Sequence, residues 1–240
     1  MVPKSHLITL EMAKDTSISK LIIKNKLDLL SPKHSFLSTF LLTERRKPDS
    51  FWRPYLDVLP QEYDCLPIFY SEKELSWLEG APFLDQVNDK IEDMKKDYNA
   101  IIEVAPEMEE FPFKEFCWAR MTASSRIFGL KIEGKKTDAF VPLAGNTNKE
   151  HDMEMLTLLD MLNHRRPKQT SWAYDQEKAA FVIKAIDDIP RGEQVYDSYG
   201  KKCNSRFLMN YGFIAEDNDG NEVAVKIGYR KDDPLRKAKE

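Results

Sequence analysis

The spacing of apolar residues changes near the middle of the chain, and this change constrains the fold more than any other feature. Before Ser125 the apolar residues recur every three or four positions, most clearly along the stripe at 83–102 between two prolines. That spacing lines one face of a helix, and the prolines mark its start and stop. After Arg126 the apolar residues form short runs between turn-forming residues, which is typical of β-strands. The sequence therefore predicts an α+β fold with a helical block ahead of most of its strands.

The same patterns place the individual elements. Besides the long helix at 83–102, shorter helices are predicted at 18–30, 34–43 and 72–78. Strands are predicted at 139–143, 179–186, 193–199 and 222–229.

Charge and composition exclude several classes of protein. The chain carries 36 Lys and Arg residues against 40 Asp and Glu, and its formal net charge of −4 does not favour binding to nucleic acid. No apolar run approaches the roughly 18 residues of a membrane span. The three cysteines form no C-x-x-C pair, which favours reduced thiols in the cytoplasm or nucleus.

Some motifs suggest chemistry that their surroundings do not support. The segment 129–136, GLKIEGKK, nearly matches a phosphate-binding loop, but Lys136 stands where that loop needs Ser or Thr, so we interpret it as a solvated turn. His164 has no second ligand at metal-binding spacing, and we expect no metal site. Ser198 and Ser205 lack the G-x-S-x-G context of a serine hydrolase.

Four short segments form a more specific pattern together than any of them does alone. They are ASSRIFGL at 123–130, DMLNH at 160–164, GEQVYDSYG at 192–200 and NSRFLMNYGF at 204–213. This set resembles the SET-domain methyltransferases, in particular the branch of the Rubisco large-subunit lysine methyltransferase. WRPYLDVLP at 52–60 and LPIFYSEKELSWLEG at 66–80 are similar to the helical insert of that branch, so the resemblance covers nearly the whole chain.

The residue types suit the chemistry of that family. The aromatic faces of Tyr199, Tyr211 and Phe213 can stabilise a desolvated cation such as a sulfonium, and they can build a narrow apolar channel. A lysine that enters such a channel loses hydration, which lowers the pKa of its amine and makes it nucleophilic. For each aromatic residue taken alone, packing in the core is the alternative interpretation.

The resemblance also implies a role for each residue. Tyr199 aligns with the catalytic tyrosine of the family. Arg126, beside Ser125, aligns with an arginine that contacts the carboxylate of the cofactor, a role that suits a guanidinium. A surface ion pair is the alternative for Arg126. The remaining predicted cofactor-binding residues are Asp160, Asn163 and His164 of DMLNH and the pocket-wall pair Tyr211 and Phe213.

The family fold implies a β-rich SET domain, with short sheets threaded into a pseudoknot, that carries a large helical insert. We expect the start of the SET domain at 1–17, the insert at 18–122, the catalytic core at 123–215, and the lead-in to a truncated C-terminal substrate-binding region at 216–240. The sequence departs from the family at two places. It contains no G-x-G, so we expect an N-terminally truncated domain, and an additional segment at 145–159 precedes DMLNH.

These features predict an enzyme that uses S-adenosyl-L-methionine to methylate a lysine side chain of a protein. A protein-histidine methyltransferase is one alternative. The others are a catalytically inactive SET-like module that binds a protein partner, and a fragment that does not fold stably. We expect a monomer with a protein substrate, no nucleic acid and no membrane partner.

Overall fold

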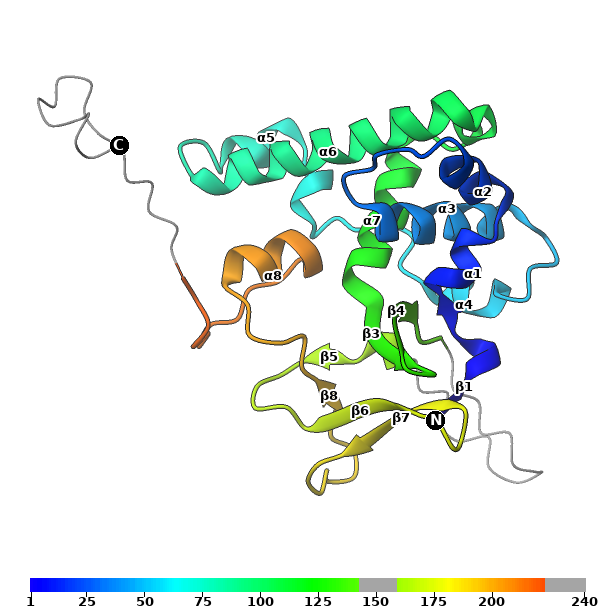
Figure 1. Cartoon of the computed structure of the whole chain (residues 1–240). Helices are drawn as coiled ribbons and strands as arrows, with labels where there is room; N and C mark the ends of the chain where they lie inside the picture. Colours follow the sequence, from blue (N-terminus) through cyan, green and yellow to red (C-terminus); the bar gives the residue numbers. More distant parts are fainter. Residues whose placement is uncertain (143–158, 223–240) are drawn as a thin grey trace, which may run out of the picture.

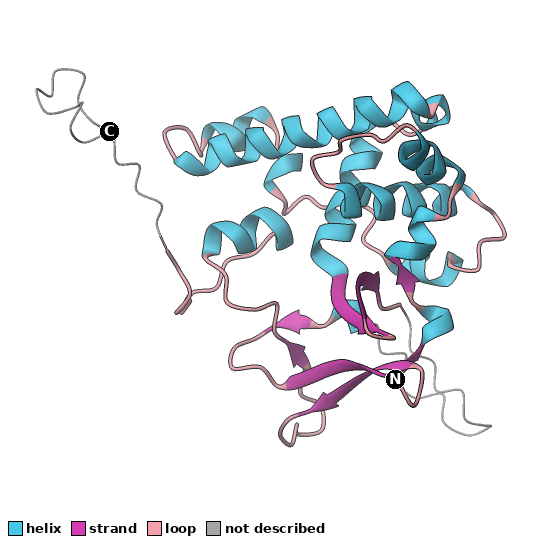
Figure 2. Ribbon diagram, viewed as in Figure 1, coloured by secondary structure: helices cyan, strands magenta, loops and turns pink. Residues whose placement is uncertain are grey.

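Helices and strands occupy two layers in the computed structural model, which describes residues 1–142 and 159–222 (Figures 1 and 2). Helices fill one layer and three small sheets the other, so the predicted α+β class is confirmed. The predicted strand at 222–229 and the segment at 145–159 lie outside the described residues, apart from residues 222 and 159.

The helical layer is built largely from the first half of the chain. Its helices are α1 (Leu10–Lys14), α2 (Ser17–Lys24), α3 (Pro32–Arg46), α4 (Arg53–Val58), α5 (Glu72–Ser76), α6 (Pro82–Val104) and α7 (Phe113–Arg126), and α8 (Asn204–Tyr211) follows late in the chain. Short 3-10 turns cover Lys4–His6, Pro67–Phe69, Pro106–Glu110 and Leu159–Met161. No helix in the described ranges is long and apolar enough to cross a membrane.

Local signals explain where several helices begin and end. The predicted helix at 83–102 is confirmed as α6, whose first residue is Pro82, where a missing N–H costs nothing. Ser71 and Glu74 form a capping box that starts α5. The helix predicted at 18–30 ends earlier, at Lys24, because the backbone turns at Lys26, whose φ is +52°.

The strands form three sheets. They are β1 (Val2–Pro3), β2 (Ile8–Thr9), β3 (Ile127–Ile132), β4 (Lys135–Phe140), β5 (Asn163–His164), β6 (Thr170–Asp175), β7 (Ala180–Ala185) and β8 (Tyr196–Asp197). The antiparallel sheets have the orders β1-β7-β6 and β2-β4-β3, and β5 pairs with β8 in parallel. The strands β1, β2, β3, β5 and β6 were not predicted. The strand predicted at 193–199 is limited to the two residues of β8, because they alone pair with β5.

The segment that resembles a phosphate-binding loop is a β-hairpin. Strands β3 and β4 pair from Ile127↔Phe140 to Ile132↔Lys135, and exposed Glu133 and Gly134 form the turn. Both turn residues have positive φ, +48° and +81°, as a two-residue hairpin turn requires. The interpretation as a solvated turn is confirmed.

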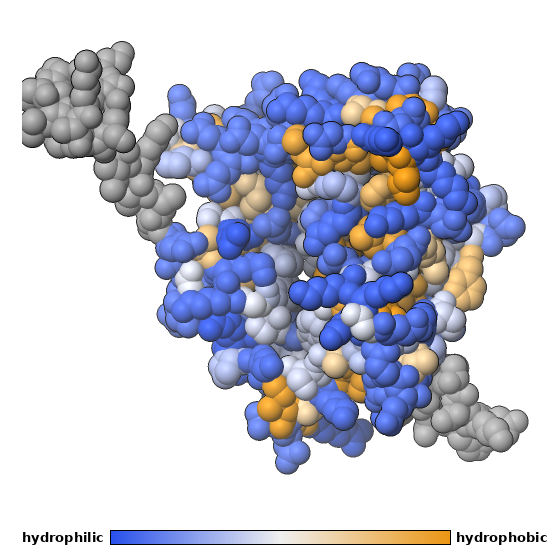
Figure 3. Space-filling view, in the orientation of Figure 1, coloured by the Kyte–Doolittle hydropathy of each residue, from blue (hydrophilic) through white to orange (hydrophobic). Residues whose placement is uncertain are grey.

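One apolar core joins the two layers. Ile8 of β2 and Phe140 of β4 are fully buried within the cluster that also holds the inner faces of α3 and α7. A second cluster packs among the sheets around Val2, Leu130 and Phe181. Hydrophilic side chains cover most of the face drawn in Figure 3, and apolar side chains come to that surface mainly over the helical layer. Helix α7 runs between the layers and leads directly into β3, so it places its last residues beside the sheets (Figure 1).

Candidate active site

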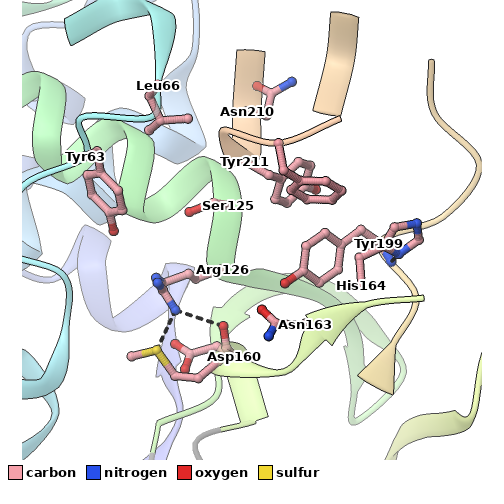
Figure 4. Close-up of a pocket in the computed structure, with 12 residues that line it drawn as sticks. Tyr63, Leu66, Ser125, Arg126, Asp160, Asn163, His164, Tyr199, Asn210 and Tyr211 are labelled. Carbon is pink, nitrogen blue, oxygen red and sulfur yellow. Dashed lines mark hydrogen bonds between the residues drawn. The ribbon is translucent and has the colours of Figure 1, made fainter. Parts of the chain in front are cut away.

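A cavity of about 460 Å³ lies where α7 ends, between β5, the segment after β8 and the end of α8 (Figure 4). Its lining residues are Tyr63, Leu66, Ser125, Arg126, Asp160, Met161, Asn163, His164, Tyr199, Asn210, Tyr211 and Phe213. All eight predicted site residues are among them. The structure therefore brings residues from all four segments between 123 and 213 to one cavity, while the individual roles of these residues remain predictions.

Arg126 is the last residue of α7 and forms one side of the cavity (Figure 4). Its Nη1 atom donates to the main-chain oxygen of Asp160 at 3.0 Å and contacts the sulfur of Met161 at 2.7 Å. Its Nε atom is buried and has no hydrogen-bond partner among the described residues. A fixed guanidinium with an unused donor suits an anionic group of a ligand.

Asp160 lies beside Arg126 in the 3-10 turn that precedes β5. Burial raises the pKa of its carboxyl group to about 6, although Arg126 and a hydrogen bond from Tyr55 act in the opposite direction. The Oδ2 atom accepts that hydrogen bond, while Oδ1 is buried without a partner in the part of the chain that the structure describes. The site thus holds a second polar atom with unused capacity.

Tyr199 stands on the other side of the cavity, just after β8. Its hydroxyl donates to the main-chain oxygen of Leu162 at 2.6 Å, and its N–H donates to Nδ1 of His164 at 3.0 Å. The parallel pairing of β5 with β8 sets this register. Burial raises the pKa of the Tyr199 hydroxyl to about 12, so it stays protonated at neutral pH. Its proton is directed at Leu162, which leaves the oxygen lone pairs free to accept.

A cluster of aromatic rings supports Tyr199. Tyr211 stacks on it with ring centroids 4.6 Å apart, and His164 stacks on it at 5.2 Å. Phe207 lies 4.8 Å from His164 and 5.0 Å from Phe213. Such faces carry partial negative charge and favour a cation held against them.

Gly212 lets the chain turn between Tyr211 and Phe213, so that both rings join this cluster. It caps α8 with φ of +78°, in the left-handed region. A Cβ at this position would lie 3.0 Å from Cβ and 3.1 Å from the carbonyl oxygen of Cys65 and still closer to its sulfur. The close approach connects α8 to the loop of the helical block that also carries Tyr63 and Leu66.

A second cavity, of about 340 Å³, shares Ser125, Arg126, Asp160, Tyr199 and Tyr211 with the first. Its other walls combine apolar side chains, among them Phe128, Leu162 and Trp172, with the polar side chains of Asp197, Ser198 and Lys202. The Phe128 and Trp172 rings meet edge to face with centroids 5.0 Å apart. Two cavities that share Tyr199 and Tyr211 can hold two reactants, one on each side of these rings.

Sequence reasoning missed several residues of the site. Phe207 lies four positions before Tyr211 on α8, and this helical spacing is a signal that places both rings on one face. Tyr55 and Tyr63 come from the helical block. Tyr55 stands in WRPYLDVLP, which resembles the insert of the family, but that resemblance assigns no role in the site to it. Where the structure is described, no three His, Cys, Asp or Glu side chains gather as metal ligands.

Comparison with known proteins identifies the protein family of this chain. The family model of the SET domain matches residues 13–200, and the chain belongs to the SET-domain family. The resemblance predicted from the four segments is therefore confirmed.

Two kinds of relative stand out. The actin-histidine N-methyltransferases of Homo sapiens and Gallus gallus are each 28% identical to this chain over 245 residues, which cover 98% of the chain and 38% of the relative. A crystal structure of the SET domain of LSMT bound to methyl-lysine and AdoHcy superposes with a TM-score of 0.75 at 24% identity, over 99% of this chain and 52% of that one. A structure of Rubisco LSMT bound to sinefungin and monomethyl-lysine gives a TM-score of 0.70 at 25% identity, over 99% and 51%.

Proposed function

We propose that this chain binds S-adenosyl-L-methionine and transfers its methyl group to a lysine side chain of a protein. The observation that carries the proposal is the pair of cavities that share Arg126 and Tyr199, one of which extends to Asn163, His164 and Phe213 and the other to Phe128 and Trp172. The chain spans 38% of the length of the curated relatives named above, and its substrate is inferred from these residues.

The first cavity suits the cofactor by its set of donors and rings. Arg126 has a buried, unpartnered Nε for a carboxylate, and Asn163 and His164 line the same wall. The rings of Tyr199, Tyr211 and Phe213 offer faces to a sulfonium. When bound, the cofactor supplies an electrophilic methyl group.

The protein's own part in the reaction is alignment and desolvation. The Tyr199 oxygen keeps its proton, which it donates in a hydrogen bond to the main-chain oxygen of Leu162, and its lone pairs accept weak C–H···O contacts. It therefore holds a group in place without changing its charge. Because the pKa of Tyr199 is about 12, this hydroxyl does not take a proton from the acceptor at neutral pH. Where Phe128, Leu162 and Trp172 line the second cavity, the loss of hydration favours the neutral amine, whose proton leaves to solvent.

Lysine and histidine are the two candidate acceptors. The apolar rings of Phe128 and Trp172 along the second cavity suit the aliphatic stem of lysine. Solved structures of similar fold contain lysine or methyl-lysine. Histidine is supported by the printed names of the sequence relatives, which are actin-histidine methyltransferases.

Binding and transfer test the proposal. We expect calorimetry to show S-adenosylhomocysteine binding in the micromolar range, about −8 kcal/mol. The Tyr199→Phe variant should lose turnover by about tenfold or more while its affinity changes little, because it lacks only the hydroxyl. Amino-acid analysis of labelled protein then separates methyl-lysine from methyl-histidine.

The matched control is Tyr98→Phe, which removes a hydroxyl bonded to the carbonyl of Phe111, away from both cavities. It should retain turnover. A folded chain that binds no cofactor would contradict the proposal and favour the inactive binding module. Unchanged turnover in Tyr199→Phe would exclude the assigned role of this residue.

A further inference from the structure

Tyr55 belongs to helix α4 of the helical layer, and its hydroxyl contacts Asp160, which lines both cavities. The side chain is 2% exposed, and its hydroxyl donates a hydrogen bond to Oδ2 of Asp160. Asp160 is itself 7% exposed and lines the first and the second cavity. This hydrogen bond connects α4 to a polar residue that lines the site.

The charge of Asp160 depends on few neighbours. Burial favours its neutral form, while the guanidinium of Arg126 and the hydroxyl of Tyr55 favour the carboxylate. The other titratable side chains that line the cavities are Tyr63, His164, Asp197, Tyr199, Lys202 and Tyr211. A hydrogen bond to an ionised carboxylate is stronger than one to a neutral acid, so the Tyr55 hydroxyl stabilises the charged form.

The ionisation state of Asp160 decides the net charge of the pair that it forms with Arg126. With an ionised carboxylate, Asp160 and Arg126 together are neutral. With a protonated one, the pair carries the single positive charge of Arg126, which repels another cation at short range. S-adenosylmethionine carries a sulfonium charge that S-adenosylhomocysteine lacks, so the two ligands differ in their response to this pair.

We infer that Tyr55 is a positioning residue: its hydrogen bond to Oδ2 keeps Asp160 ionised, and the ionised carboxylate favours the sulfonium form of the cofactor over the neutral thioether product. The inference rests on the proposed function, since it assigns Tyr55 to the same cofactor site. It further implies that helix α4, through Tyr55, sets the ratio of the affinities for S-adenosylmethionine and S-adenosylhomocysteine.

The test compares two ligands in three proteins. Calorimetry from pH 5 to pH 8 gives the affinities of wild type, Tyr55→Phe and Tyr98→Phe for S-adenosylmethionine and for S-adenosylhomocysteine. At pH 7 we expect Tyr55→Phe to bind S-adenosylmethionine about tenfold more weakly, because it loses a hydrogen bond to a charged group, and S-adenosylhomocysteine less than about twofold more weakly. The pH midpoint of S-adenosylmethionine binding should rise in this variant. Tyr98→Phe should match wild type in the ratio of the two affinities.

A merely structural role would give a different result. If Tyr55→Phe weakens both ligands by the same factor and leaves the pH midpoint unchanged, the inference is wrong. Asp160→Asn is the second variant, because it keeps an oxygen for the Tyr55 hydroxyl and removes the charge. It should lose the ligand preference and its pH dependence, and a retained preference would overturn the inference. If wild type binds neither ligand, the proposed function fails and the inference fails with it.

Discussion

Replacing Asp97 by alanine tests how the helical layer holds α7, the helix that carries Arg126 into the cavity. Asp97 lies on α6, is 1% exposed and accepts four hydrogen bonds. They come from the main-chain nitrogens of Leu30 at 2.7 Å and Ser31 at 3.2 Å, the Ser35 hydroxyl at 3.0 Å and the Arg120 guanidinium at 3.0 Å. One carboxylate therefore joins the start of α3 and the middle of α7 to α6.

The loss of stability in Asp97→Ala can be estimated from the buried groups that the substitution leaves without a partner. Arg120 would keep a buried charge without its carboxylate, and its Nε already has no partner among the described residues. Breaking a buried pair from one side costs about 3–5 kcal/mol. The main-chain N–H groups of Leu30 and Ser31 add to this loss where water cannot reach them. We expect the free energy of unfolding to fall by about 4 kcal/mol, a large part of the roughly 5–15 kcal/mol typical of a domain.

Urea unfolding followed by circular dichroism measures this loss. The control is Lys96→Ala, which removes an exposed partner of Asp93 on the same helix and should cost less than about 0.5 kcal/mol. The double variant Asp97→Ala, Arg120→Met should be less destabilised than Asp97→Ala alone, because it no longer buries an unpaired charge. A loss below about 1 kcal/mol in Asp97→Ala, or a double variant that is worse than the single one, would refute the reasoning.

Two further predictions concern stability near the site. Gly212→Ala should lower the temperature of thermal unfolding more than Gly192→Ala does. Both glycines have positive φ, but a Cβ at Gly212 would also clash with Cys65, whereas a Cβ at Gly192 would have no atom within 4 Å. Equal losses of stability in the two variants would contradict the close approach of Gly212 to Cys65. Burial raises the pKa of Asp160 to about 6 from an unfolded value near 3.9, so its contribution to stability is present below about pH 4 and is lost as the pH rises through about 6. A shift of about two pKa units corresponds to a loss of about 3 kcal/mol. Urea unfolding of wild type and Asp160→Asn from pH 3.5 to pH 7 isolates this loss as a change in the difference between their free energies of unfolding. If that difference does not change with pH, the pKa of Asp160 is not raised.

The sequence predicts the parts of the fold that rest on local patterns. The stripe on α6 and the turn at Glu133 and Gly134 follow from spacing and turn chemistry, and the structure confirms both. Strand β5 was not predicted as a strand, because its two residues gain that state by pairing with β8, more than thirty positions away in the chain. No local pattern contains that partner.

The same limit applies to the site. Arg126 and Tyr199 could be predicted because each stands in a motif of the family, and the structure places both at one cavity. Tyr55 could not, since the resemblance of WRPYLDVLP to the insert of the family assigns no role in the site to any of its residues. Its hydrogen bond to Asp160 joins positions 105 apart, which becomes visible only when the layers are assembled.

The helical layer is therefore part of the site as well as its support. Tyr63 and Leu66 line the first cavity, Cys65 fixes the turn that orients Phe213, and Tyr55 holds Asp160. Arg126 and Tyr199 approach the cavity from opposite sides, one from α7 and the other from the strands (Figure 4). The distance between them depends on how the helices pack on the sheets. Because protein interiors are close-packed, a shift of α7 changes the position of the Arg126 guanidinium relative to the aromatic cluster across the cavity. Substitutions far inside the helical layer should therefore change ligand affinity as well as stability.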